Sequence, residues 1–466
     1  MKNLSGNNSN SHNGNPLGWE RMPVLLFKFA LPAIIAMVVS SLYNVVDQIF
    51  IGHGVGYLGN AATNVAFPLN TICIAIMLTL GIGSATRFSI YLGQKKEEDA
   101  AKVVGSGIVM MTIFGVAYMI LVEIFCQPLL KLFGATDEIL EYAIEYTKIT
   151  AIGMPFVMLQ NGISKLTMAD GSPTYSMMTM LIGCILNTIL DPIMIFVFHM
   201  GVKGAAIATV IGQIVSFIAA LTYMWQFKRV SLKPEYFKFS IKETLTTIKM
   251  GMSPGLTQLA ITLVQVTMNL SLVHYGNQSA YGSSIPLAGT GIVMKINAIV
   301  ISVIIGLNQG LQPILGFNYG ARNFDRVKQA FLLAVKFAAV ITISALIIFE
   351  VYPRGVIGLF GSGDENYVKY SIHFMRIFLC LLPLGAFQML SANFFSSTGK
   401  AIKGAMLSLT RQVIFFIPLL LTLPLFMGFE GILWTGPIAD FISFLVVLYF
   451  ILVEFKKMSS SQIQEQ

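Results

Sequence analysis

Two aspartates stand out as residues that could do chemistry, because each lies inside a long apolar run. Asp47 belongs to the first of these runs and Asp191 to the fifth. An ionisable group at membrane depth costs at least ~2.5–3.5 kcal/mol on insertion scales, so each one calls for a reason. Two carboxyl groups brought together in apolar surroundings can bind and release a proton near neutral pH. The pair therefore predicts a site for a coupling ion.

Two more oxygen donors accompany the aspartates. Asn187 precedes Asp191 by four residues, which places both on one helix face. Thr209, in the sixth apolar run, adds a hydroxyl from a neighbouring helix. Two carboxylates, an amide oxygen and a hydroxyl form a set of hard oxygen ligands that suits a proton or Na⁺. The competing interpretation is that these groups only hydrogen-bond across the bundle and hold its helices together.

Composition places these residues in a membrane protein. Hydrophobic residues make up 55% of the 466 residues and charged residues 11%, whereas a soluble protein carries roughly 25% charged residues. The formal charge of +8 comes from basic residues in short loops, which favours a topology signal and argues against nucleic-acid binding. The four cysteines are scattered through apolar segments and are interpreted as small hydrophobic residues.

Twelve apolar runs divide the chain into two halves of six. The first half holds runs near 24–51, 61–92, 101–126, 139–168, 172–199 and 203–227. The second half holds runs near 244–273, 283–317, 327–351, 366–397, 402–427 and 431–455. Each run is long enough to span a bilayer as a helix. The predicted fold class is an all-α integral membrane protein, with twelve transmembrane helices in two six-helix bundles.

Loop composition predicts the domains and the orientation. The expected parts are a disordered cytoplasmic tail (1–20), an N-lobe (21–227), a cytoplasmic linker (228–243), a C-lobe (244–456) and a second cytoplasmic tail (457–466). Basic residues concentrate at the termini and in one set of alternate loops, while the other set holds only Lys131, Lys203 and Arg354. By the positive-inside rule, both termini are cytoplasmic and the chain lies in the cell membrane.

The two halves repeat each other. Gly83 and Gly93 recur as Gly310 and Gly320 in the second half. Since six spans is an even number, the halves are predicted to be parallel repeats related by a pseudo-twofold axis along the membrane normal. Such a pair can hold a substrate at its midplane and expose it alternately to each side by rocking.

The repeat does not extend to the acidic cluster. The second-half positions that correspond to Asp47, Asn187, Asp191 and Thr209 are Asn269, Phe415, Leu419 and Pro437. The scaffold is therefore duplicated while the carboxylates occur in one lobe. Scaffold need alone does not explain that asymmetry.

Three segments together resemble a known family. They are Tyr-Asn-Val-Val-Asp-Gln-Ile-Phe-Ile-Gly at 43–52, Leu-Asn-Thr-Ile-Leu-Asp-Pro at 186–192 and Gly-Leu-Gln-Pro-Ile-Leu-Gly-Phe-Asn-Tyr-Gly-Ala at 310–321. Each is weak alone, but in combination they resemble the MATE (multidrug and toxic compound extrusion) transporters over about residues 20–456. The resemblance implies a twelve-helix, two-lobe exporter of lipophilic and cationic compounds, driven by inward H⁺ or Na⁺. It also implies that Asp47, Asn187, Asp191 and Thr209 form a cation site in the N-lobe.

Other polar residues at membrane depth are candidates for the substrate cavity. They are Asn44, Gln160, Gln258, Gln265, Lys295, Arg376, Gln388 and Asp440. Another branch of the family carries acidic residues in the seventh and tenth helices, whereas this chain has only uncharged candidates there, Gln258, Gln265 and Gln388. A cation site in the second lobe is therefore not expected. Lys295, Arg376, Arg411 and Asp440 either pair across the second lobe or line its cavity.

The expected partners are lipophilic cations and the bilayer, with the chain acting as a monomer and needing no cofactor other than the coupling ion. No Gly-x-x-x-x-Gly-Lys-Ser/Thr motif is present, so the energy must come from an ion gradient. Three alternatives stay open. A lipid-linked saccharide flippase of the same superfamily would use Lys295, Arg376 and Arg411 to hold a pyrophosphate. An integral-membrane enzyme and a passive facilitator are the other two.

Overall fold

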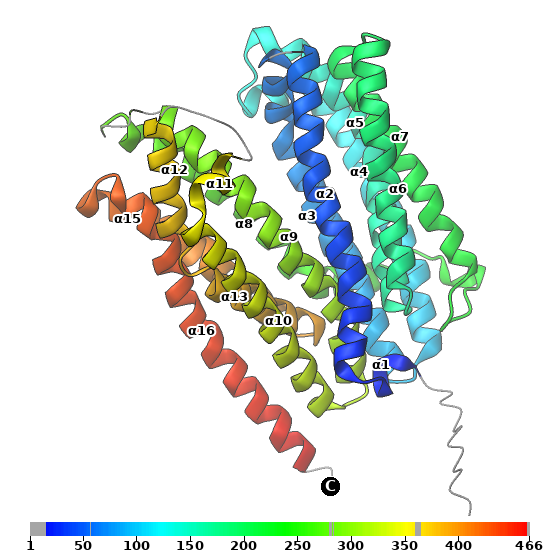
Figure 1. Ribbon diagram of the computed structural model, residues 1–466. Coiled ribbons are helices and arrows are strands. Elements are labelled where there is room, and N and C mark those ends of the chain that lie inside the picture. The colour runs from blue at the N-terminus through cyan, green and yellow to red at the C-terminus, as the bar shows by residue number, and fades with distance from the viewer. Residues whose placement is uncertain (1–14, 56, 279–281, 283, 359–364, 464–466) are drawn as a thin grey trace, which may run out of the picture.

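The protein is a bundle of long helices in the computed structural model, which describes residues 15–55, 57–278, 282, 284–358 and 365–463 (Figure 1). The helices of the N-lobe are α2 (Met22–Val55), α3 (Tyr57–Gly93), α4 (Glu97–Leu132), α5 (Asp137–Ala169), α6 (Pro173–Pro192) with its π-helical continuation η1 (Ile193–Val197), and α7 (Gly201–Leu221). Those of the C-lobe are α8 (Ile241–Gly276), α9 (Ser284–Gly320), α10 (Phe324–Val351), α11 (Pro353–Gly358), α12 (Glu365–Phe378), α13 (Leu382–Ser397), α14 (Ala401–Leu409), η4 (Thr410–Phe416), α15 (Ile417–Met427) and α16 (Glu430–Ile463).

These helices account for most of the twelve spans expected from the sequence. Within the described ranges, ten are by themselves long and apolar enough to cross a membrane. The number is eleven when α12 and α13, bent by 51° at their junction, are counted as one broken span. Helix α5 is equally long but more polar, and it packs against α3, α4 and α7.

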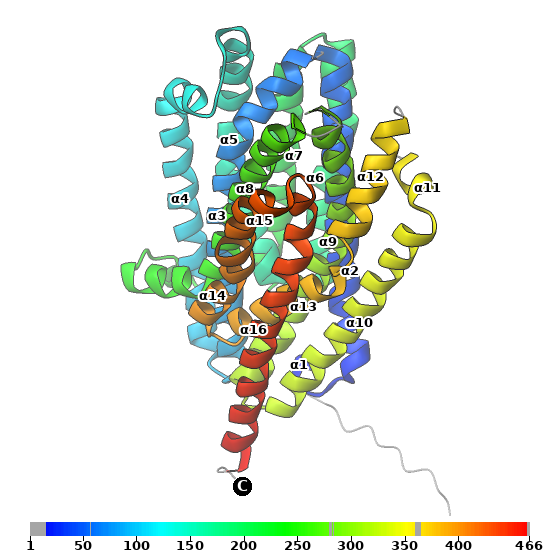
Figure 2. The ribbon, with the colours of Figure 1, turned by 90° about the vertical axis from the view of Figure 1, so that its left-hand side faces the viewer.

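The two lobes meet mainly along three helix pairs, α3 with α8, α2 with α9 and α3 with α9. Glycine permits these approaches, because a Cβ on Gly251 would meet the backbone of Thr79, and one on Gly310 would meet that of Ala30. Small residues at such positions let membrane helices pack closely. All these contacts lie toward the end of the molecule that carries α1 (Pro16–Trp19), and the lobes diverge toward the other end (Figure 1). Figure 2 shows the N-lobe behind the C-lobe from a perpendicular direction.

The predicted tails need correction where the structure describes them. Residues 1–14 lie outside the described residues, but the rest of the predicted tail (1–20) contains α1, in which Leu17 is 1% exposed. Its carbonyl accepts hydrogen bonds from the side chains of Asn318 and Arg326, so the segment is fixed to the C-lobe. At the other end, α16 continues to Ile463, through most of the tail predicted at 457–466. Both segments are polar in sequence. A search for long apolar runs therefore does not predict that they are helical.

The linker predicted at 228–243 is shorter than expected. Ser240 caps α8 by accepting a hydrogen bond from the amide of Glu243, so the helix begins at Ile241. A single 3₁₀ turn, η3 (Pro234–Tyr236), interrupts the rest of the linker. At its start, the carboxylate of Asp170 accepts hydrogen bonds from the amides of Lys228 and Arg229. Burial raises the pKa of Asp170, against the lowering effect of these hydrogen bonds.

Candidate functional site

The acidic cluster lies in the N-lobe, where α2, α6 and α7 meet. Asp47 comes from α2, Asn187 and Asp191 from α6, and Thr209 from α7. The carboxyl groups of Asp47 and Asp191 are hydrogen-bond neighbours, and Asp191 is fully buried. The structure therefore gathers all four residues predicted for ion coupling.

Asn187 links the members of the cluster. Its side-chain amide donates to Oδ1 of Asp191 at 3.2 Å and to Oγ1 of Thr209 at 3.2 Å. The four-residue spacing on α6 places Asn187 and Asp191 on one face. Directly after Asp191 the helix continues through Pro192 into η1, whose π-helical form is frequent at functional sites.

Three side-chain oxygen atoms of the cluster are unpaired within the described ranges. Oδ1 of Asp47, Oδ2 of Asp191 and Oδ1 of Asn187 are buried and have no hydrogen-bond partner in the part of the chain that the structure describes. No basic side chain from that part pairs with either aspartate. Buried polar atoms are costly to leave unpaired. Two carboxylates with amide and hydroxyl oxygens offer a proton or Na⁺ the hard ligands that such a cation prefers.

Two tyrosines border the cluster and were not identified from the sequence. Tyr43 of α2 and Tyr146 of α5 both lie near Asp47 and Asp191. The spacing of four residues between Tyr43 and Asp47 is a signal that could have revealed the first. Tyr146 gives no local signal, because α5 reaches the cluster only through tertiary packing.

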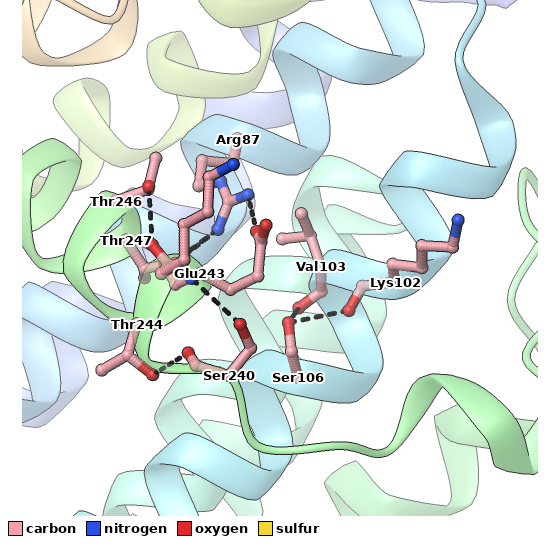
Figure 3. Close-up of polar contacts among 10 residues, drawn as sticks. Arg87, Lys102, Val103, Ser106, Ser240, Glu243, Thr244, Thr246 and Thr247 are labelled. Carbon is pink, nitrogen blue, oxygen red and sulfur yellow. Dashed lines mark hydrogen bonds and ion pairs between the residues drawn. The ribbon is translucent and has the colours of Figure 1, made fainter.

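A second polar cluster joins the lobes near α1, and Figure 3 shows it in detail. Arg87 of α3 is 3% exposed and points to the first turns of α8. Its guanidinium donates to the carbonyl of Glu243 at 3.1 Å and to Oγ1 of Thr247 at 2.9 Å, and it forms an ion pair with the Glu243 carboxylate. Sequence reasoning missed this contact because Glu243 fell in the predicted linker.

A glutamine of α9 fastens the same seam between the lobes. The side-chain amide of Gln312 donates to the carbonyl of Ile82 at 3.2 Å and to Oγ1 of Thr86 at 2.9 Å, both on α3. Together with Arg87, this contact fixes α3 to both α8 and α9 at the end near α1. This seam is therefore closed in the structure.

Comparison with known proteins agrees with this architecture. A family model described as MatE matches residues 32–193 and 255–422, one segment in each lobe. These segments cover more than half of the chain. The chain belongs to the MatE family.

Curated relatives of this MatE chain carry a common name. The multidrug export protein MepA of Staphylococcus haemolyticus (strain JCSC1435) is 26% identical over 437 residues, covering 91% of this chain and 92% of the relative. MepA of Staphylococcus aureus (strain MSSA476) is 27% identical over 426 residues with the same coverage. Membership in a family of transporters confirms the prediction that the chain is not an enzyme.

Solved structures show the same fold. An outward-facing multidrug resistance MATE family transporter of the MOP superfamily has a TM-score of 0.90 at 22% identity, covering 96% of this chain and 99% of that one. A MOP superfamily transporter from Pyrococcus furiosus has a TM-score of 0.89 at 23% identity with equal coverage. The twelve-helix, two-lobe prediction is thereby confirmed.

The eight candidates for the substrate cavity do not form one cluster in this MatE chain. Two of them donate hydrogen bonds to the backbone: Asn44 donates to the Ser40 carbonyl, and Gln388 donates to the Leu407 carbonyl. Two others form ion pairs, Arg376 with Glu350 and Asp440 with Arg411. Gln160 is buried on α5, Gln258 is half-buried on α8, and Gln265 and Lys295 are exposed on α8 and α9. Their part in substrate binding stays a prediction.

Three of the four C-lobe charges form ion pairs within that lobe. The Arg376 Nε donates to the Glu350 carboxylate at 3.1 Å, and Arg411 pairs with the buried Asp440. Lys295 is exposed. Whether these residues also line the substrate cavity stays a prediction.

Proposed function

We propose that this chain is a secondary active multidrug exporter of the cell membrane, with both termini in the cytoplasm. It exchanges lipophilic or cationic compounds, moving outward, for H⁺ or Na⁺ moving inward. Asp47, Asn187, Asp191 and Thr209 hold the coupling ion. The observation that carries the proposal is a buried pair of carboxylates with unpartnered oxygens and no basic partner in the described ranges. The names of the MepA relatives support the substrate class.

The arrangement of the lobes supports the direction of transport. The lobes are fastened near α1, at the end that the basic loops assign to the cytoplasm, and diverge toward the opposite end. Arrival of H⁺ or Na⁺ from outside neutralises charge at Asp47 and Asp191, which changes the packing of α2 against α6 and releases the drug outward. Opening of the seam then lets the ion leave to the cytoplasm and a new substrate enter.

An ion gradient is strong enough for this task. One elementary charge moving through 100 mV releases ~2.3 kcal/mol. That free energy sustains roughly a fiftyfold concentration gradient of substrate.

Ethidium efflux from proteoliposomes tests the proposal. We expect the parent protein to drive efflux under an imposed pH gradient or Na⁺ gradient, and Asp191→Asn to abolish that response. Equal, gradient-independent efflux by both proteins would indicate a passive facilitator. If folded protein moves no ethidium under either gradient, the flippase gains weight, and lipid-linked saccharides become the next substrates to assay.

A further inference from the structure

A buried lysine at the seam between the lobes has no partner among the described residues. Lys165 lies on α5, one turn before the helix ends at Ala169, and is 8% exposed. Among the residues that the structure describes, none makes a hydrogen bond or an ion pair with its ammonium group. A buried ammonium group is costly unless it is paired. Lys165 is therefore an anomaly that the proposed coupling site does not explain.

The side chain lines a crevice shared by both lobes. The N-lobe wall includes Ser89 of α3 and Lys165, and the C-lobe wall includes Gln309 and Gln312 of α9. The space between these walls is too narrow in this state to admit water. Among the described residues, no acidic residue lines it. The carboxylate of Asp170, five residues further along, accepts hydrogen bonds from the Tyr223 hydroxyl and from the linker amides and does not pair with Lys165.

The chemistry of the walls selects the ligand. An ammonium group has three donors and no acceptor, so it calls for an oxyanion. In this closed state the Ser89 hydroxyl donates to the Ala85 carbonyl and the Gln312 amide donates to Ile82 and Thr86. When the lobes part, the Gln312 amide is released and can donate to such a group. Within the described part of the chain no carboxylate lines the crevice, so the anion would come from a ligand.

We infer that the crevice around Lys165 is the closed form of an anion subsite. When the lobes part on the cytoplasmic side, Lys165 binds the carboxylate or phosphate group of an amphiphile that enters there. The inference rests on the proposed alternating exposure of the seam, and it assigns to Lys165 the recognition of an anionic group on the compound or lipid that enters there. The acidic cluster and this subsite lie near opposite ends of the N-lobe, since Asp191 is 18 residues, or about 27 Å, along α6 from Pro173.

A matched pair of dyes tests the subsite. A cationic rhodamine methyl ester and the free acid of the same dye, a zwitterion, differ only by the carboxylate. We expect Lys165→Met to lower transport of the free acid at least about tenfold, the worth of a charge-assisted hydrogen bond, and to leave the ester within about twofold. Lys165→Arg should retain transport of the free acid. Lys148→Met, an exposed lysine on the same helix, is the control and should change neither.

Vesicle composition distinguishes the two sources of the anion. If the ligand is the headgroup phosphate of an anionic lipid, Lys165→Met should slow both dyes only in vesicles that contain phosphatidylglycerol. It should not do so in vesicles of phosphatidylcholine alone, where the choline ammonium balances the charge of the phosphate. An equal loss of both dyes in both vesicles, or no change at all, would overturn the inference.

Binding to purified protein separates this inference from the proposed function. Fluorescence anisotropy should show that Lys165→Met weakens binding of the free acid at least about tenfold and leaves the ester unchanged. This result would support the subsite even if the parent protein failed to export either dye under a gradient. Equal affinities of the two proteins for the free acid would contradict it.

Discussion

The two lobes share a scaffold but differ in how they partner the acidic residues buried within their helices. In the described part of the C-lobe, the two buried acids each face a base: Asp440 pairs with Arg411, and Glu454 pairs with Lys400 and Lys403. In the N-lobe, Asp47 and Asp191 face each other, and no base in the described ranges pairs with them. Paired charges stabilise one packing arrangement, whereas unpaired carboxylates leave a place for a mobile cation. Under the proposed function, the coupling chemistry therefore belongs to the N-lobe, and the C-lobe repeats the scaffold without it.

The sharpest way to break this comparison is to neutralise one acid in each lobe. Asp191→Asn should reduce gradient-driven ethidium efflux to the rate of protein-free vesicles, because a neutral amide cannot take up and release a proton or charge-balance Na⁺. Asp440→Asn should keep a gradient response in the protein that remains folded. Initial rates per folded transporter, under imposed H⁺ and Na⁺ gradients, measure both. Loss of coupling in the Asp440 variant alone would transfer the coupling role to the C-lobe.

The same C-lobe pair should matter for stability. Asp440→Asn leaves Arg411 without its partner inside the membrane and should lower the free energy of unfolding by about 2 kcal/mol, below the cost at a fully buried pair because Arg411 is partly exposed. A double variant, Asp440→Asn with Arg411→Gln, should recover part of that loss. Thermal unfolding in detergent measures the three proteins. If the double variant recovered none of the lost free energy of unfolding, Asp440 would stabilise the protein in some way other than its pairing with Arg411.

Between the lobes, the pair of Arg87 and Glu243 should hold closed the seam at the end of the molecule that carries α1. Glu243→Gln removes the charge partner and should increase the population in which the lobes have parted. Spin labels at Lys102→Cys and Ser460→Cys, one in each lobe and both exposed, would report it as a longer distance. The labels require a background without the four native cysteines.

Glu235→Gln is the matched control for this distance measurement, because it removes an exposed glutamate of the linker. It should leave the distance distribution unchanged. If Glu243→Gln also left it unchanged, Gln312 and the glycine contacts would be sufficient to close the seam, and the ion pair would have no part in it.

Sequence reasoning reached the acidic cluster because its signals are local. Asn187 and Asp191 lie four residues apart, and an aspartate inside an apolar run is conspicuous by itself. The partners of Arg87 were out of reach, since Glu243 is 156 residues away in the chain and resembles an ordinary linker residue. The order of residues 15–20 was hidden for the same reason, because Leu17 is held by Asn318 and Arg326 from the far half of the chain. Periodicity and composition predicted the spans, and only tertiary contacts could predict the seam.

The smallest expected effect compares two buried cations of the N-lobe seam. Arg87 has three acceptors on α8, whereas Lys165 has none in the described ranges. Arg87→Met should therefore lower the melting temperature, because it leaves Glu243 and Thr247 without their donor. Lys165→Met should raise it by about 1–3 °C, because the apolar side chain carries no desolvation cost. Differential scanning fluorimetry of the two variants, with Lys148→Met as the surface control, measures the contrast. A lower melting temperature for Lys165→Met would show that the lysine stabilises the closed seam, and the N-lobe would then pair this charge as the C-lobe pairs its own.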